Sequence, residues 1–163
     1  MRDYKKKILN CAAMVDECAR LKAAGKAVVF TNGCFDLLHC GHVSYLNFAR
    51  EQGDVLVLGM NSDASVKRNK GDDRPINCEE DRAEVLAALE CIDYVVLFDE
   101  DEPAELIESL VPDVLVKGED WAHYVSGREA VEAAGGKVVL AKMVEGRSTT
   151  GTIEKVLKVY GKE

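Results

Sequence analysis

Two histidines, His39 and His42, are the side chains whose types and spacing most clearly suggest chemistry. They follow a β-branched apolar run and a glycine-containing loop. His42 falls in the first turn of an expected helix, in which Val43, Leu46 and Ala49 repeat at helical spacing. A strand–loop–helix junction of this kind gathers backbone N–H groups, the positive end of a helix dipole and two imidazoles around one small volume. These features predict a site for a polyphosphate.

Glycine-rich phosphate loops of the common kinds are absent from the sequence. It contains neither G-x-x-x-x-G-K-[ST] nor G-x-G-x-x-G, so neither a P-loop nor a dinucleotide-binding fingerprint applies. A second candidate phosphate site is the segment 146–151, where an arginine and three hydroxyl side chains precede the last expected helix. Hydroxyl-rich helix starts usually act as helix caps, but the position of this one after the final strand favours phosphate binding.

Cysteine and histidine side chains raise the alternative of a metal site. Cys34, His39, Cys40 and His42 lie within nine residues, and both residue types are common zinc ligands. The spacing has no C-x-x-C knuckle, and the adjacent His39 and Cys40 would rarely reach one ion together, so no metal ligands are expected. The sequence has six cysteines but no export signal, so a disulfide framework is not expected either.

Composition limits the possible partners. The chain has 163 residues, of which 47% are apolar, and a formal net charge of −8, which suits one well-buried core. An acidic chain is not expected to bind nucleic acid, although a single site on it can be locally positive. No apolar run reaches the length of a membrane span, and no signal-peptide core follows the lysine-rich start. We therefore expect no membrane association and a cytoplasmic protein.

Helices and strands are expected to alternate along the chain. A helix over about residues 5–24 precedes five strands, at residues 27–31, 55–59, 94–98, 114–117 and 137–141. A polar, basic segment at 61–75 follows the second strand. Residues 126–129 have the pattern of a capping box that opens a helix.

Continuous apolar strands separated by helices are typical of a parallel sheet with both faces covered. With right-handed crossovers, the pattern predicts a Rossmann-like, doubly wound α/β domain with a five-stranded parallel sheet. Such sheets bind ligands at the carboxyl ends of their strands, near the point where the strand order reverses. Four polar segments follow strands and are expected to meet there: residues 31–42, 61–74, 117–121 and 141–150. Their convergence is the main reason to expect an enzyme.

The segment TNGCFDLLHCGHVSYL, residues 31–46, closely resembles the signature of the cytidylyltransferase-like nucleotidyltransferases, and residues 146–150 resemble their second signature. With NSDASVKRNKGDDRPIN, DVLVKGEDW and EGRSTT, the chain is similar more narrowly to the D-glycero-β-D-manno-heptose 1-phosphate adenylyltransferases. In many bacteria that activity is one half of a bifunctional heptose kinase/adenylyltransferase, and here it would stand alone. The resemblance implies a nucleotidyltransferase domain at residues 26–163, with residues 1–25 as a helical extension packed on it.

The resemblance also implies roles for individual residues. His39 and His42 would be catalytic, donating hydrogen bonds to the α-phosphate and its bridging oxygen as charge builds there. The implied nucleotide- and phosphate-binding residues are Thr31, Asn32, Gly33, Cys34, Lys67, Lys70, Arg82, Lys117, Gly118, Asp120, Trp121, Ser148, Thr149 and Thr150. For Lys67 and Lys70 a solvated charge is the open alternative, and for Arg82 it is a surface ion pair.

The implied reaction transfers AMP from ATP to the sugar 1-phosphate and releases pyrophosphate by direct in-line attack. Because an acceptor phosphate is already nucleophilic, positioning and charge stabilisation suffice without a strong general base. Mg²⁺ would be required and held mainly by phosphate oxygens and water. Two alternatives stay open: a cytidylyltransferase that uses CTP and a polyol or amino-alcohol phosphate, and a nucleotide-binding domain without turnover. A homo-oligomer also stays open, because the N-terminal helix could pack on its own domain or on a second copy.

Overall fold

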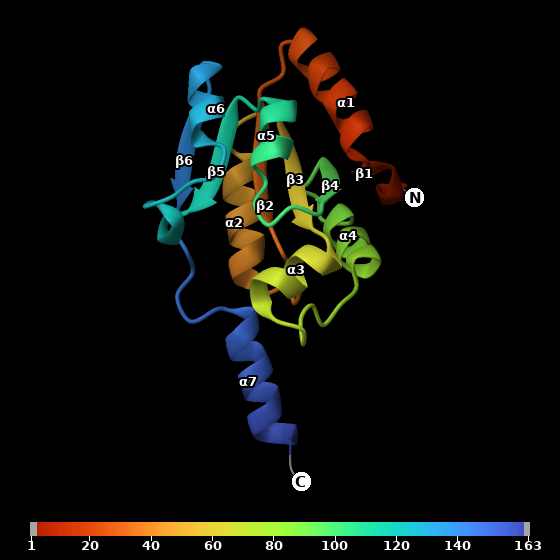
Figure 1. Cartoon of the computed structure of the whole chain (residues 1–163), viewed down its shortest axis with the longest axis vertical. Coiled ribbons are helices and arrows are strands. Elements are labelled where there is room, and N and C mark those ends of the chain that lie inside the picture. The colour runs from red at the N-terminus through yellow and green to blue at the C-terminus, as the bar shows by residue number, and fades with distance from the viewer. Residues whose placement is uncertain (1–2, 162–163) are drawn as a thin grey trace.

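A six-stranded sheet, parallel in every strand pair, forms the centre of the computed structural model, which describes residues 3–161 (Figure 1). Its strand order is β1-β4-β3-β2-β5-β6. The strands are β1 (Ile8–Leu9), β2 (Val28–Gly33), β3 (Val55–Asn61), β4 (Tyr94–Phe98), β5 (Val114–Gly118) and β6 (Lys137–Ala141). The order runs outward in one direction from β2 to β3 and β4, and in the other direction from β2 to β5 and β6. The strand order therefore reverses between β2 and β5.

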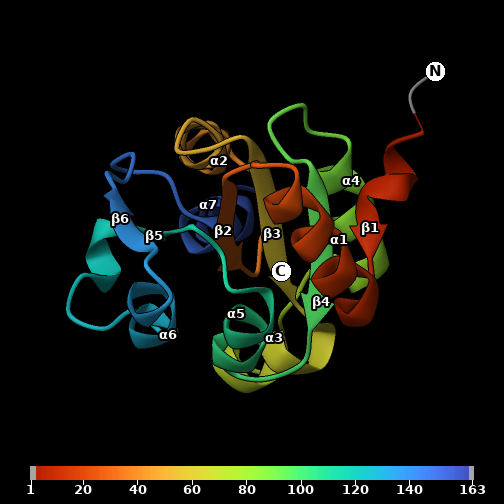
Figure 2. The same cartoon turned by 90° about the horizontal axis from the view of Figure 1, so that it is seen from above.

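Helices cover both faces of this sheet (Figure 2). α2 (Cys40–Arg50) and α4 (Glu79–Ala87) pack on one face, whereas α1 (Cys11–Ala23), α5 (Ala104–Leu110) and α6 (Arg128–Ala133) pack on the other. The remaining helices are α3 (Asp63–Lys70), α7 (Thr149–Tyr160) and the 3₁₀ turns η1 (Tyr4–Lys7) and η2 (Glu119–Trp121). This arrangement confirms the prediction of a Rossmann-like, doubly wound α/β fold.

The two cores follow from the alternation of side chains along each strand. Val29 of β2 points toward α2 and α4, whereas its neighbours Val28 and Phe30 point toward α1 and α5. All seven residues of β3 are buried, because the strand lies inside the sheet and is covered on both faces. The continuous apolar runs seen in the sequence are the consequence of this double coverage.

The N-terminal segment differs from the sequence prediction, and this difference adds the sixth strand. In place of one helix over residues 5–24, it forms η1, the short strand β1 and then α1. Ile8 and Leu9 pair with Val95 and Val96 at the edge of the sheet. Asn10 ends the extended stretch, because its side chain accepts a hydrogen bond from the Ala13 N–H and caps α1. The division into an extension and a domain at residue 25 stays a prediction.

Two other local predictions also need correction. The segment 61–75 contains α3, which Ser62 caps by accepting a hydrogen bond from the Ser65 N–H. The capping box at residues 126–129 is wrong: α6 begins after Gly127, which has φ 81°, and no side chain caps it. A side chain at Gly127 would contact Ile107, with its Cβ 2.8 Å from Ile107 atoms. The Ser126 hydroxyl is therefore not used as a cap.

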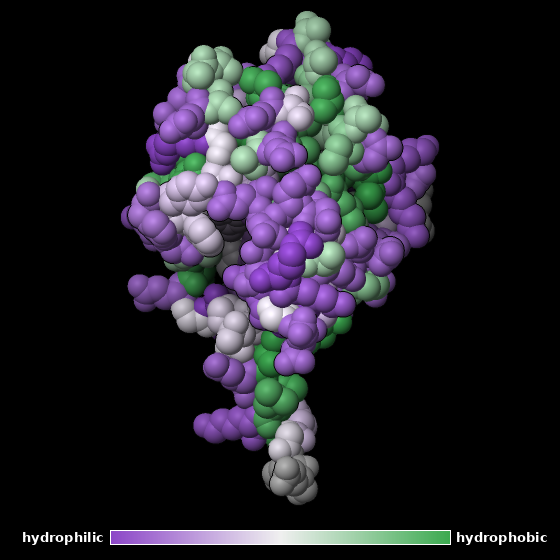
Figure 3. Space-filling view, in the orientation of Figure 1, coloured by the Kyte–Doolittle hydropathy of each residue, from purple (hydrophilic) through white to green (hydrophobic). Residues whose placement is uncertain are grey.

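α7 projects from the rest of the molecule, as Figures 1 and 3 show. None of its described residues is buried, and its apolar stripe, which includes Val156, Leu157 and Tyr160, is exposed. Only the first turn of α7 comes near the sheet edge where ligands are expected. Among the described residues, no helix combines the length and the apolar character needed to cross a membrane.

Candidate active site

The carboxyl ends of β2 and β5 separate and leave a crevice where the strand order reverses. β2 pairs with β3 as far as Gly33, but its pairing with β5 is recorded only for Val29 and Phe30. Beyond that point the Thr31 hydroxyl of β2 donates to the Val116 carbonyl of β5 at 3.0 Å, and the Tyr45 hydroxyl of α2 donates to the same carbonyl at 3.1 Å. The crevice therefore lies where doubly wound sheets bind their ligands.

The two histidines lie beside this crevice as a stacked pair. His39 occupies the N-cap position of α2 and His42 its first turn, with ring centroids 3.8 Å apart and planes inclined by 17°. The Phe35 ring lies against His42 at 5.2 Å. Among the described residues, neither Nδ1 atom has a hydrogen-bond partner, although both are buried. The sequence prediction of a strand–loop–helix junction that carries both imidazoles is confirmed in its geometry.

Both imidazoles are neutral near pH 7. Burial, assisted by the neighbouring His39, lowers the pKa of His42 to about 4. Burial, with the charge of Arg147, also lowers the pKa of His39. A neutral imidazole carries one N–H and can donate one hydrogen bond to a phosphate oxygen. Two such donors in a desolvated position suit the stabilisation of charge that develops during a reaction.

Two cavities meet at His42. The larger, about 500 Å³, and the smaller, about 210 Å³, share His42, Lys117, Trp121 and the loop at residues 32–35. The larger cavity extends toward α3 and the segment after β4, and Figure 3 shows the surface hollowed in this region. The smaller cavity extends toward Gly118, Asp120 and Met143, between the ends of β2 and β5. His42 therefore lies where the two binding spaces meet, whereas His39 lines neither cavity and stacks against His42.

Several side chains named from the sequence line these cavities. They are Asn32, Gly33, Cys34, Lys70, Lys117, Gly118, Asp120, Trp121, Thr149 and Thr150, together with His42. Lys67 lies on the exposed side of α3 and lines neither cavity, and Thr31 is buried in the sheet behind the loop. Ser148 caps α7 by accepting a hydrogen bond from the Gly151 N–H at 3.0 Å.

Lys117 is the cation placed most deeply at the junction of the two cavities. Its Nζ donates to the Asn32 amide oxygen at 2.6 Å and lies 5.8 Å from the centre of the Trp121 ring. Burial lowers its pKa to about 8, against the opposing effects of Glu102 and Asp120. The ammonium group is thus mainly charged at pH 7, and a bound phosphate would stabilise that charge further.

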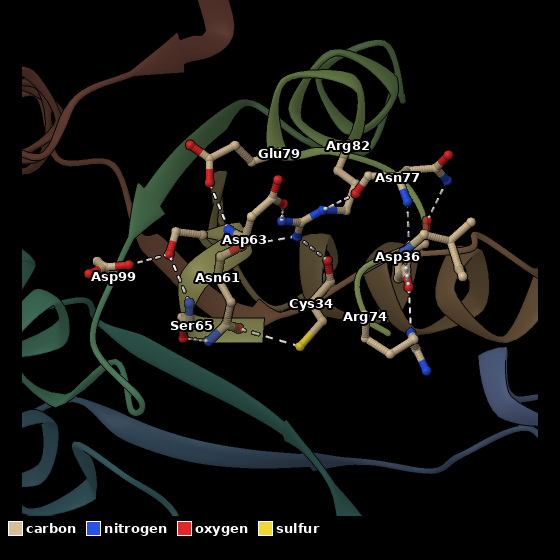
Figure 4. Close-up of polar contacts among 12 residues, drawn as sticks. Cys34, Asp36, Asn61, Asp63, Ser65, Arg74, Asn77, Glu79, Arg82 and Asp99 are labelled. Atoms are coloured by element: carbon tan, nitrogen blue, oxygen red, sulfur yellow. Dashed lines mark hydrogen bonds and ion pairs between the residues drawn. The ribbon is translucent and has the colours of Figure 1, made fainter. Parts of the chain in front are cut away.

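Arg82 is buried and bound to the protein itself (Figure 4). Its guanidinium donates to the carbonyls of Cys34, Asn61 and Asn77 at 2.7, 2.9 and 3.1 Å, and to the Asp63 carboxylate at 2.7 Å. These four acceptors come from the loop after β2, the end of β3, the start of α3 and the segment before α4. Arg82 therefore joins four segments behind the site, and its ion pair with Asp63 is not the surface ion pair of the alternative, because the Arg82 side chain is buried.

Asp36 forms a second brace behind the loop. Its buried carboxylate accepts hydrogen bonds from Arg74 Nε at 2.6 Å and from the backbone N–H groups of Ile76 and Asn77 (Figure 4). Although burial acts to raise it, the pKa of Asp36 is lowered by these hydrogen bonds and by the Arg74 charge. The adjacent Phe35 has a left-handed backbone, with φ 48°. The hydrogen bonds of Arg82 and those of Asp36 together hold this strained loop, and hence the Phe35 ring, against His42.

The larger cavity also contains residues that the sequence analysis did not single out. They are Asn61, Asn69, Arg74, Asp101, Glu102, Pro103, Tyr124 and Ser126, together with Phe35 and Asp36. Arg74 lies in a basic segment whose position after a strand was a usable signal. The segments 101–103 and 124–126 carry no motif that predicts ligand binding, since Ser126 was predicted only as a helix cap, and only the fold brings them to the cavity.

Comparison with known proteins gives the class that this fold and site define. Residues 30–156 match the cytidylyltransferase-like family, and the chain belongs to that family, which confirms the nucleotidyltransferase prediction. Over 158 residues it is 60% identical to the bifunctional protein HldE of Geobacter sulfurreducens, covering 96% of this chain and 32% of that protein. It is 57% identical over 162 residues to HldE of Geobacter metallireducens, covering 99% of this chain and 33% of that protein. The chain thus spans about a third of the length of these relatives.

A solved structure shows the same fold. The lipopolysaccharide core biosynthesis protein from Thermoplasma volcanium GSS1 superposes with a TM-score of 0.61 at 27% sequence identity. The match covers 76% of this chain and 100% of that one.

Proposed function

We propose that the protein transfers AMP from ATP to D-glycero-β-D-manno-heptose 1-phosphate, giving ADP-heptose and pyrophosphate. The observation that carries the proposal is the stacked His39–His42 pair, whose His42 lines both cavities at the point where the strand order reverses. The resemblance of four segments to heptose 1-phosphate adenylyltransferases supports the choice of substrates. The relatives are named bifunctional proteins, and a match to a third of their length fits one of two activities.

In the proposed reaction, an oxygen of the acceptor phosphate attacks the α-phosphorus of ATP. The bond from that phosphorus to the bridging oxygen breaks, and pyrophosphate leaves with the electron pair of that bond. His39 and His42 would each donate an N–H to the α-phosphate or the bridging oxygen, because both are neutral at pH 7. No proton needs to leave the acceptor, so the histidines act as donors and not as bases.

The remaining site residues would hold the two substrates around this centre. Lys117 would bind phosphate where the two cavities meet, and Lys70 would do so in the larger one. Thr149 and Thr150 would reach the β- and γ-phosphates from the first turn of α7. The smaller cavity, with Gly118, Asp120 and Trp121, would hold the nucleoside. We infer that Ser148, Thr31 and Arg82 act by supporting this arrangement, and that Lys67 contributes long-range charge.

Mg²⁺ is proposed to enter with the nucleotide. In the part of the chain that the structure describes, no three His, Cys, Asp or Glu side chains are grouped so that they could hold a metal ion. The cation would accordingly be held by phosphate oxygens and water, with the protein supplying the positive surroundings. When bound, Mg²⁺ would neutralise charge on the phosphates. We also propose that the protein acts in the cytoplasm; light scattering of the purified chain would test whether it forms a homo-oligomer.

Pyrophosphate release would test the proposal. The purified protein, with Mg²⁺ and D-glycero-β-D-manno-heptose 1-phosphate, is assayed in parallel with ATP, CTP, GTP and UTP. We expect release with ATP that depends on the acceptor. Preference for CTP would favour the cytidylyltransferase alternative. Nucleotide binding without pyrophosphate release, whichever acceptor phosphate is added, would favour a domain without turnover.

A further inference from the structure

The larger cavity is lined by charged side chains of both signs. Lys70 and Arg74 supply cations, of which Arg74 also pairs with Asp36, and Asp101 and Glu102 supply carboxylates. Carboxylates repel phosphates but accept hydrogen bonds from hydroxyl groups. This lining therefore suits a ligand that combines an anionic phosphate with a neutral, hydroxyl-bearing body.

Neighbouring side chains hold Asp101 and Glu102 in place. The Asp101 carboxylate pairs with Arg68 Nε at 2.7 Å, and the Asn69 amide donates to the Asp101 carbonyl at 3.1 Å. The Tyr124 hydroxyl donates to Glu102 at 2.7 Å. This bond and the Glu102 charge raise the pKa of Tyr124, with a small opposing effect from the nearby Ser126. Asp101 is thus committed to α3, whereas Glu102 keeps acceptor capacity toward the cavity.

Ser126 is a second, independent feature of the larger cavity. It lines the cavity and is only 7% exposed, and its Oγ has no hydrogen-bond partner among the described residues. The helix that follows takes no cap from it, because α6 begins after Gly127. An unpaired buried hydroxyl is unfavourable, and a ligand hydroxyl placed beside it would satisfy it.

We propose that Glu102, Tyr124 and Ser126 form a polyol-binding wall that recognises hydroxyl groups of the acceptor sugar. Glu102 accepts from one or two sugar hydroxyls, Ser126 both donates and accepts, and Tyr124 holds Glu102 in place. Lys70 and Arg74 hold the phosphate. This inference rests on the proposed function, because it assigns the acceptor of that reaction to the larger cavity.

The position of the wall favours the acceptor over the ribose of ATP, which also offers neighbouring hydroxyls. The two cavities share His42 and Lys117, which places the reacting phosphates at their junction. The three wall residues line the larger cavity and not the smaller one. A nucleoside in the smaller cavity leaves the wall to the second substrate.

Kinetics of Glu102→Gln and Ser126→Ala would test the wall. The KM for the sugar 1-phosphate should rise about tenfold or more for Glu102→Gln and severalfold for Ser126→Ala, with the KM for ATP within about twofold of wild type. Glu108→Gln and Ser109→Ala are matched controls, because both side chains are exposed on α5 and line neither cavity. A rise in the KM for ATP, or an unchanged KM for the acceptor, would overturn the assignment.

Direct binding separates this inference from the proposed function. Isothermal titration needs no turnover. The ligands are D-glycero-β-D-manno-heptose 1-phosphate and, as a probe of the cations Lys70 and Arg74, inorganic phosphate. Weaker sugar phosphate binding in the two variants, with unchanged phosphate binding, supports the wall. Equal affinity of wild type and variants for the sugar phosphate refutes it. If wild type uses only another polyol phosphate, the same variants are titrated with that compound: weaker binding would retain the wall and reject the heptose acceptor, whereas unchanged binding would reject both.

Discussion

Replacing Arg82 by methionine should destabilise the protein as a whole. Methionine has a similar stem but no hydrogen-bond donors, so four acceptors behind the site lose their partner: three main-chain carbonyls and the Asp63 carboxylate. Removing one member of a buried charged network costs about 3–5 kcal/mol, because the groups left behind stay desolvated. For a chain of this size, that corresponds to a melting temperature lower by roughly 6–20 °C.

Thermal and urea unfolding, monitored by circular dichroism, would measure this loss. The control is Arg128→Met on α6, which removes a half-exposed ion pair with Glu132 (3.2 Å) and should cost no more than about 0.5 kcal/mol. ATP affinity is then measured at a temperature where both variants are folded. A stable Arg82→Met protein that has lost ATP binding would refute the reasoning and make Arg82 a phosphate ligand, as the family resemblance implies.

Three further predictions concern the histidines and the tryptophan. His42→Asn should keep the fold and bind ATP within an order of magnitude of wild type while kcat falls about a hundredfold or more, as steady-state kinetics would show; equal loss of folding would make His42 structural. The pKa of His42 is about 4 in the folded protein and near 6.5 in the unfolded chain, so between these pH values the unfolded chain binds one more proton than the folded protein. The free energy of unfolding should therefore fall by up to about 3 kcal/mol as the pH drops from about 6.5 to 4, and His42→Asn should flatten that dependence in urea titrations. Fluorescence of Trp121, the only tryptophan, should change on ATP addition, and an unchanged spectrum at saturation would remove Trp121 from the nucleoside site.

The sequence predicted those parts of the molecule in which local pattern and tertiary role agree. The buried runs of β2, β3 and β5 carry continuous apolar residues because helices cover both faces of the sheet. The histidine loop was recognisable because its chemistry and its helix lie in one short segment. The parallel order then brings that loop beside Lys117, as the general rule for such sheets requires.

The sequence was less informative where a short strand pairing or one backbone conformation decides the structure. β1 has only two residues and exists through its pairing with β4, so no hydrophobic periodicity predicts it. The pattern at Ser126 looked like a helix cap, but Gly127 enters α6 with a left-handed backbone and leaves the hydroxyl free. Glu102 lies in a different loop from Tyr124 and Ser126, and only folding brings the three to one cavity.

The bonds made by Arg82 have a consequence for how this sequence can vary. Three of its four acceptors are main-chain carbonyls, at Cys34, Asn61 and Asn77, and every amino acid supplies that group. Substitutions at these three positions, of which Cys34 and Asn61 line the larger cavity, can change the side chains without deleting any of those carbonyl acceptors. The hydrogen bonding that joins these segments thus depends on one codon, that of Arg82, and the codons for the three acceptor positions are free to change during the evolution of new ligand specificity.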